Sequence, residues 1–164
     1  MQNGYEVFFL DESGFILIDY KVYGWYPKGS HPVKPFVFDN HHRTSIAGAL
    51  STKGFIVAKQ YDSINGETFL KFLKKLKKQY DKIVLIMDNI STHYTKKLMR
   101  WYKRNKVVII KFPKYSPQLN PIEQYWKNIK QWLGTRPPLT FKGLKTTLDI
   151  ALKNENLWPS SYGY

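Results

Sequence analysis

The sequence predicts an α/β protein in which helices pack on a mixed β-sheet. Its first third carries short aromatic and β-branched runs separated by turn residues, a pattern typical of antiparallel strands. The remainder alternates amphipathic helical patterns with short apolar runs, as in βαβ units. At 164 residues, with 43% hydrophobic side chains, the chain is long enough for one domain with its own core.

Four strands are expected in the first part of the chain. Tyr5–Leu10 and Phe15–Ile18 flank the run Asp11-Glu12-Ser13-Gly14, whose turn chemistry predicts a hairpin. Ser45–Leu50 and Phe55–Lys59 flank a second turn and predict a second hairpin. A long irregular segment rich in glycine and proline separates the two hairpins.

Helices dominate the rest of the chain. Apolar residues recur at helical spacing in four segments, Phe69–Tyr80, Tyr94–Trp101, Leu119–Leu133 and Phe141–Ala151. The apolar runs Lys82–Met87 and Val107–Ile110 lie between them and predict strands that are buried on both faces. Thr140 is the expected N-cap of the last helix, and the tail after Asn154 is expected to be poorly ordered.

Composition excludes several classes of protein. The absence of cysteine excludes a disulfide scaffold, a thiolate metal site and a cysteine nucleophile. No apolar run approaches the roughly 18 residues of a membrane span, and the N-terminus lacks the pattern of a signal peptide. We therefore expect a soluble cytoplasmic protein.

The charge balance indicates a polyanionic partner. Lysine and arginine outnumber acidic residues by 26 to 12, for a net charge of +14, which favours nucleic acid through counterion release. A lysine-rich surface that only aids solubility is the alternative. The candidate DNA-binding residues are cations on two predicted helices: Lys96, Lys97, Arg100, Lys103, Arg104 and Lys127.

Three carboxylates occupy comparable places near strand ends. Asp11 follows the first strand, Asp88 follows an apolar strand, and Glu123 lies in the first turn of a helix. Strand ends of an α/β sheet line the crevice where ligands bind. Like charges gathered there raise each other's pKa, and a divalent cation resolves the conflict. Oxygen ligands without a cysteine or histidine cluster favour Mg²⁺ or Mn²⁺.

Each carboxylate also has a purely structural interpretation. Asp11 could begin an Asx turn, and Asp88 could cap the helix that follows it. Glu123 could complete a capping box with Asn120, with Pro121 in the first helical position. Its helical phase places Glu123 at the border of the core.

Three segments together carry a resemblance to a known family. They are Phe8–Phe15, Leu85–Asn89 followed by His93, and Tyr115–Glu123 running into Trp126 and Lys130. They resemble the catalytic domain of mariner-like DDE transposases, including bacterial and archaeal insertion-sequence relatives. The separation of Asp88 and Glu123 is also typical of that family.

The resemblance implies a ribonuclease-H-like fold, with a mixed five-stranded sheet flanked by helices. It implies that Asp11, Asp88 and Glu123 are the catalytic residues and bind two Mg²⁺ or Mn²⁺ ions. It also implies cleavage of double-stranded DNA at transposon ends, strand transfer to a TA target, and a homodimer on paired ends. Glu12 is a rival to Asp11, but it would face the other side of the strand.

Further residues follow from the same motifs. Substrate positioning or support of the metal ligands is expected from Asn89, His93, Asn120 and Lys130. The aromatic residues Trp25, Tyr26 and Phe36 either stack on a DNA base or pin the long irregular segment.

We expect one catalytic domain over residues 1–164, with a core at about 5–153. The family's N-terminal helix-turn-helix modules have no room before Tyr5, so the chain is expected to be a catalytic fragment or one half of a split reading frame. Two other functions remain open: another ribonuclease-H-like nuclease or resolvase, and a domesticated, inactive DNA-binding domain.

Overall fold

A computed structural model describes residues 4–17, 27–30, 39–113 and 116–159. Five strands form one sheet in the order β3-β2-β1-β4-β5. They are β1 (Glu6–Leu17), β2 (Asp39–Ser51), β3 (Ile56–Tyr61), β4 (Ile83–Met87) and β5 (Val108–Lys111). β1, β2 and β3 pair antiparallel, whereas β4 pairs parallel with both β1 and β5. The predicted mixed five-stranded sheet is confirmed.

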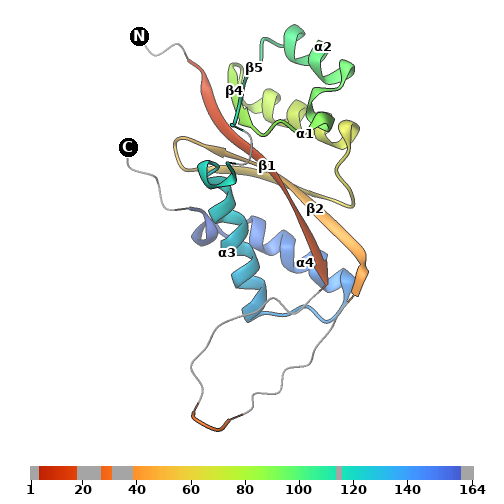
Figure 1. Ribbon diagram of the computed structural model, residues 1–164, viewed down its shortest axis with the longest axis vertical. Helices are drawn as coiled ribbons and strands as arrows, with labels where there is room; N and C mark the ends of the chain where they lie inside the picture. The colour runs from red at the N-terminus through yellow and green to blue at the C-terminus, as the bar shows by residue number, and fades with distance from the viewer. Residues whose placement is uncertain (1–3, 18–26, 31–38, 114–115, 160–164) are drawn as a thin grey trace.

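Two layers of helices enclose this sheet (Figure 1). The helices are α1 (Gly66–Gln79), α2 (Lys96–Arg104), α3 (Ile122–Thr135) and α4 (Phe141–Leu152). Short 3₁₀ turns are η1 (Ser91–Tyr94), η2 (Pro117–Leu119) and η3 (Glu155–Leu157). α1 and α2 pack on one face of the sheet, and α3 and α4 pack on the other. None of the described helices has the length and apolar character needed to cross a lipid bilayer.

Successive side chains of β1 point alternately into the two hydrophobic clusters, one under each layer of helices. Phe8 and Leu10 belong to the cluster under α1 and α2. Phe15 and Leu17 belong to the cluster under α3 and α4. Successive strand residues point to opposite faces, so Asp11 and Glu12 must also point to opposite layers.

The hairpin expected around Asp11–Gly14 is wrong. These residues continue a single strand, and their partners in β2 run from Gly48 opposite Asp11 to Ser45 opposite Gly14. Gly14 is needed because the Arg43 guanidinium lies over it, where a Cβ would collide. Asp11 therefore lies in the middle of β1 and begins no Asx turn.

Two other expectations fail at the margins of the fold. β5 is not buried on both faces, because it is an edge strand and leaves Val108 and Ile110 43% and 49% exposed. Residues 155–159 pack on the fold: η3 follows Asn154, and the Asn128 amide donates a hydrogen bond to the Leu157 carbonyl, whereas residues 160–164 lie outside the described part of the chain. The predicted N-cap at Thr140 is confirmed, since its side chain accepts from the Gly143 N–H.

Candidate active site

The register of two parallel strands places Asp11 beside Asp88. Phe9 pairs with Ile86 in the β1–β4 ladder, so Asp11 and Asp88 are each two residues further along neighbouring strands. Adjacent strands lie roughly 4.8 Å apart, and residues two positions further on share a face. Asp88 directly follows the end of β4, so its backbone lies beside that of Asp11 at this point of the sheet.

Trp126 of α3 orients the Asp11 carboxylate. Its indole N–H donates a hydrogen bond to Asp11 Oδ2 at 3.0 Å, and the ring is only 2% exposed. The ring lies against Gly48 of β2, where a Cβ would stand 2.6 Å from Trp126 Cη2. Gly48 thus makes room for the indole, and the indole links α3 to the middle of β1. Trp126 is part of a sequence motif, but no local pattern in the sequence predicts its hydrogen bond to Asp11.

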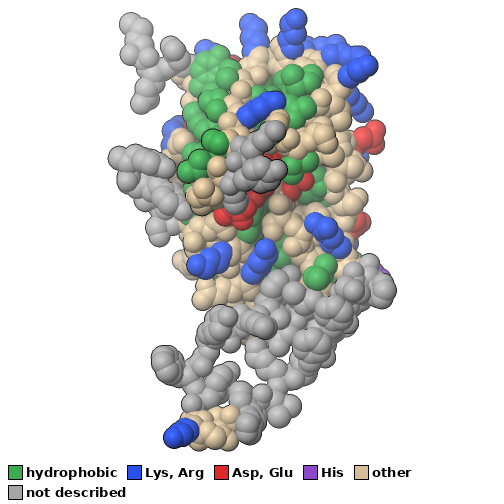
Figure 2. Space-filling model, in the orientation of Figure 1, with side chains coloured by type: hydrophobic (Ala, Val, Ile, Leu, Met, Phe, Trp, Pro, Cys, Tyr) green, Lys and Arg blue, Asp and Glu red, His purple; other side chains and the backbone are tan. Residues whose placement is uncertain are grey.

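Asp11 has an unusual affinity for protons. Burial raises the pKa of its carboxyl from 3.8 to about 6, while the backbone N–H of Glu12 and the Trp126 indole oppose the rise. The nearby carboxylates of Glu123 and Asp88 raise this pKa further. All three predicted acids therefore share one electrostatic environment (Figure 2), and acidic side chains gather near the middle of the face shown there.

The acids are not drawn together into a closed site. Among the described residues, no three acidic or histidine side chains are close enough to hold a metal ion as they stand. Glu123 projects from the first turn of α3 and is exposed.

His93 lies between Glu12 and Asp88 in the opposite layer. Its Nε2–H donates to Glu12 Oε1 at 3.1 Å, and its ring stacks on Phe69 with centroids 4.3 Å apart. The ring is 2% exposed, so its orientation is tightly constrained. Glu12 thus faces away from Asp11, as predicted.

Asp88 presents a buried oxygen that no hydrogen bond satisfies within the described part of the chain. Asp88 Oδ1 lies 3.2 Å from His93 Nδ1, but the two atoms do not form a hydrogen bond. Asp88 caps no helix either, since η1 has no side-chain cap and Thr95 caps α2. The structural interpretation of Asp88 is therefore wrong.

The capping box proposed for Glu123 does not form. Pro121 is the N-cap of α3 and no side chain caps it; only the Glu123 backbone N–H reaches the Asn120 carbonyl, at 3.1 Å. Asn120 is buried, and its Oδ1 lacks a hydrogen-bond partner within the described residues. Because Glu123 is exposed, its expected place at the border of the core is also wrong.

The other predicted residues are spread around this centre. Asn89 is exposed just after Asp88. Lys130 of α3 is exposed, with Nζ 6.0 Å from the Phe15 ring centroid, and Lys127 is exposed on the same helix. The five predicted cations of α2 are all exposed: Lys96, Lys97, Arg100, Lys103 and Arg104. The aromatic residues Trp25, Tyr26 and Phe36 lie outside the described residues.

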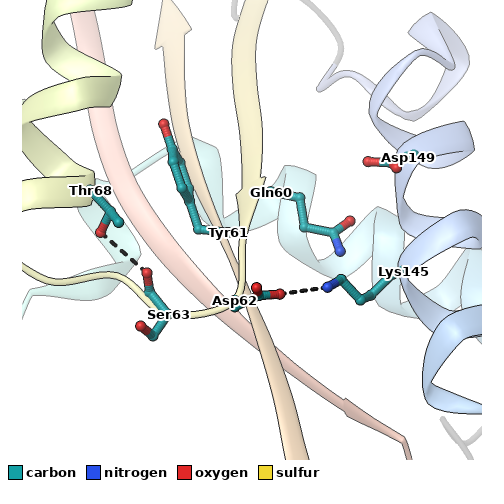
Figure 3. A pocket seen from close by; sticks show the side chains of 7 residues that line it. All are labelled: Gln60, Tyr61, Asp62, Ser63, Thr68, Lys145 and Asp149. Carbon is teal, nitrogen blue, oxygen red and sulfur yellow. Dashed lines mark hydrogen bonds and ion pairs between the residues drawn. The ribbon is translucent and has the colours of Figure 1, made fainter.

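Hollows lined by described residues include one at the predicted site and one away from it. One, of about 440 Å³, adjoins the predicted site and is lined by Asp11, Glu12 and His93 among others. The other, of about 480 Å³, lies between β3 and α4, where Asp62 pairs with Lys145 at 2.5 Å (Figure 3). None of the predicted site residues lines this second hollow.

Solved structures define the class of this fold. It matches the Mos1 transposase paired-end complex with a TM-score of 0.68 at 14% identity, covering 92% of this chain and 49% of that one. It also matches the catalytic core domain of BIV integrase with a TM-score of 0.58 at 16% identity, covering 89% of this chain and 80% of that one. The fold is ribonuclease-H-like, as predicted.

Sequence comparison assigns the family. Residues 6–145 match the family described as DDE superfamily endonuclease, and the chain belongs to that family. It is 36% identical over 87 residues to an uncharacterized 39 kDa protein of insertion element IS630 from Shigella sonnei, which covers 50% of this chain and 25% of that protein. It is 35% identical over 51 residues to the Tc1 transposase of Caenorhabditis elegans, covering 31% and 19%. The chain thus spans a quarter or less of these relatives.

Proposed function

We propose that this chain is the catalytic domain of a transposase, which cleaves DNA at transposon ends and transfers the strand to target DNA. Asp11, Asp88 and Glu123 are its catalytic residues. Membership of the DDE endonuclease family and the transposase relatives support this function. The observation that supports it best is the proximity of these acids, since the charges of Glu123 and Asp88 both raise the pKa of the Asp11 carboxyl.

The residues present fit a divalent metal. Their donors are carboxylate oxygens, which Mg²⁺ and Mn²⁺ prefer. Asp88 contributes a buried oxygen with no hydrogen bond from the described residues, and Asp11 has a raised pKa that a cation would reverse. Mos1 structures with Mn and with Mg support the same metals. Asp11, Asp88 and Glu123 would hold the divalent ions, of which we propose two for each active site.

The chain's own residues orient and support this chemistry. When bound, two divalent ions activate the attacking oxygen and stabilise the leaving oxygen of an in-line displacement. Trp126 holds one Asp11 oxygen in place through its indole N–H. His93, held by Glu12 and stacked on Phe69, limits the positions open to Asp88. No covalent protein–DNA intermediate is needed, so none of the serine or tyrosine residues acts as a nucleophile.

Double-stranded DNA is the proposed partner, both as transposon end and as target. The net charge of +14 and the exposed cations of α2 support backbone contacts that do not depend on sequence. Insertion at a TA dinucleotide, a dimer on paired ends and a place in the prokaryotic cytoplasm with the nucleoid belong to the same proposal. Residues 1–164 then form one catalytic domain.

Nicking of a supercoiled plasmid tests the proposed function. The chain should nick the plasmid when Mn²⁺ is added and not when EDTA is present. Asp88→Asn keeps the shape of the side chain and removes a charged ligand, so it should abolish nicking without lowering the melting temperature. The proposed function fails if Asp88→Asn nicks as fast as the parent chain.

A further inference from the structure

A stripe of lysines covers the outer face of α1, and the proposed function leaves it unused. The residues that α1 buries include Phe69, Phe72, Leu73 and Leu76. Its exposed lysines form one stripe at spacings of three and four residues: Lys71, Lys74, Lys75 and Lys78. Such residues lie about 5–6 Å apart along a helix surface. The stripe points away from the sheet because the opposite side of α1 is packed against it.

α2 extends this positive surface within the same layer. It buries Leu98 and Tyr102 against the cluster that α1 covers and exposes five cations. Glu67 is the one acidic residue in the sequence of either helix, and its carboxylate lies 3.5 Å from Lys97 Nζ. The two helices together form a face with a large excess of positive charge. Lysine and arginine side chains gather at the upper end of the molecule, where Figure 1 places α2 (Figure 2).

This face is separate from the candidate active site. Glu123 and Trp126 belong to α3, in the opposite layer, and Asp11 points toward that layer. Asp88, whose Oδ1 lies 3.2 Å from His93 Nδ1, stands between the two layers, whereas the α1 stripe points outward from the sheet. The lysines of α1 would therefore contact phosphates other than those at the site of cleavage.

We propose that the outer face of α1 and α2 binds the backbone of a second stretch of duplex DNA, outside the segment that is cut. The inference rests on the proposed function, because it takes DNA as the substrate. Phosphates on a duplex are spaced regularly and carry one charge each, which matches a row of flexible ammonium groups. The contact is independent of sequence, since phosphate contacts carry no sequence information.

The test compares two variants that lose the same charge. The first replaces the α1 stripe: Lys71→Gln, Lys74→Gln, Lys75→Gln and Lys78→Gln. The control replaces four exposed lysines elsewhere: Lys28→Gln, Lys59→Gln, Lys142→Gln and Lys153→Gln. Glutamine has a helix propensity close to that of lysine, so α1 should remain folded, as circular dichroism and the melting temperature can check.

Binding to a duplex of arbitrary sequence is measured by fluorescence anisotropy in EDTA over a series of salt concentrations. Each lost phosphate contact should reduce the slope of log K against log[salt] by roughly 0.9. The α1 variant should therefore lose a slope of about 2 to 4 and bind at least about tenfold more weakly at low salt. The control should change little, and replacing the same four α1 lysines by arginine should preserve both slope and affinity.

Equal losses in the two glutamine variants would overturn the proposal, because the effect would then follow net charge alone. The use of EDTA separates this result from the proposed function, which depends on metal. If the α1 variant and the control lose affinity equally while Mn²⁺-dependent nicking is intact, only the second DNA surface is refuted. If the α1 variant loses affinity as expected but the parent chain does not nick DNA, only the catalytic assignment is refuted.

Discussion

Asp11 lies in the middle of β1, where burial makes the ionised form of its carboxyl group unfavourable. The pKa of its carboxyl is raised to about 6, mainly by burial, whereas the ordinary value is 3.8. The native state therefore binds more protons than the unfolded state between about pH 4 and pH 6. The free energy of unfolding must fall as pH rises through that window.

Asp11→Asn should remove this pH dependence in the metal-free protein. The rise of the pKa from 3.8 to about 6 corresponds to at most about 3 kcal/mol. Relative to the parent chain, the variant should therefore gain stability between pH 4 and pH 7, while its amide oxygen still accepts from Trp126. Urea unfolding in EDTA at a series of pH values measures the difference. Identical pH profiles for the two proteins would refute the assigned shift.

Gly48 is predicted to be intolerant of even one added methyl group. A Cβ there would meet Trp126 Cη2 at 2.6 Å, and the indole has no free space because it is buried. Gly48→Ala should lower the free energy of unfolding by about 1–3 kcal/mol and weaken Mn²⁺ binding by shifting the donor to Asp11. Chemical denaturation and calorimetric titration give the two values.

Gly66→Ala is the matched control for that substitution. A Cβ at residue 66 meets only Thr95 Cγ2 at 3.9 Å, which is ordinary contact, in the first turn of α1. The variant should be as stable as the parent chain or more stable by up to about 1 kcal/mol. A loss of stability equal to that of Gly48→Ala would mean that the Trp126 contact is not the cause.

Substitutions at the N-termini of α3 and α4 can distinguish a catalytic role from a helix-capping role. Thr140 caps α4 through its side chain, whereas Glu123 makes no cap for α3. Thr140→Ala should lower stability by about 1 kcal/mol and leave Mn²⁺-dependent nicking intact. Glu123→Gln should change stability by less than about 0.5 kcal/mol and remove most nicking.

Thermal melts and plasmid nicking of the two variants provide the measurement. The opposite pattern, in which Glu123→Gln melts early and still nicks, would show that Glu123 serves α3 and not the metal site. The pair also controls for general effects of substitution at a helix start, because both residues lie in or beside a first turn.

Helices were predictable from local patterns, but the course of β1 was not. The apolar spacing in α1 and α3 repeats on one side over several turns, which directly reflects the buried face. The run Asp11-Glu12-Ser13-Gly14 has turn chemistry, yet the β2 ladder pairs its backbone and the strand continues. This pairing joins residues more than 30 positions apart, so no local pattern contains it.

Local sequence patterns also leave part of the candidate site unpredicted, because some of its contacts join distant parts of the chain. The sequence motifs indicate Asp11, Asp88 and Glu123, and the strand register explains why the first two are neighbours. The role of Trp126 was not predictable, because its hydrogen bond joins residues 115 positions apart. The false capping box arose because Asn120 has the right type and spacing, although its side chain is buried and makes no cap.

Exposed cations lie in both helical layers around the candidate site. They occur on α1 and α2 in one layer and on α3 and α4 in the other. We propose that Asp11, Asp88 and Glu123 bind divalent metal between these layers.

Diffraction from crystals soaked in Mn²⁺ tests that claim most directly. We predict anomalous density between Asp11, Asp88 and Glu123, with Glu123 drawn inward from its exposed position and Trp126 still bound to Asp11. Crystals of Asp88→Asn soaked in the same way should lose at least one of the two peaks. Density at other carboxylates with none between these three would contradict the assignment of the site.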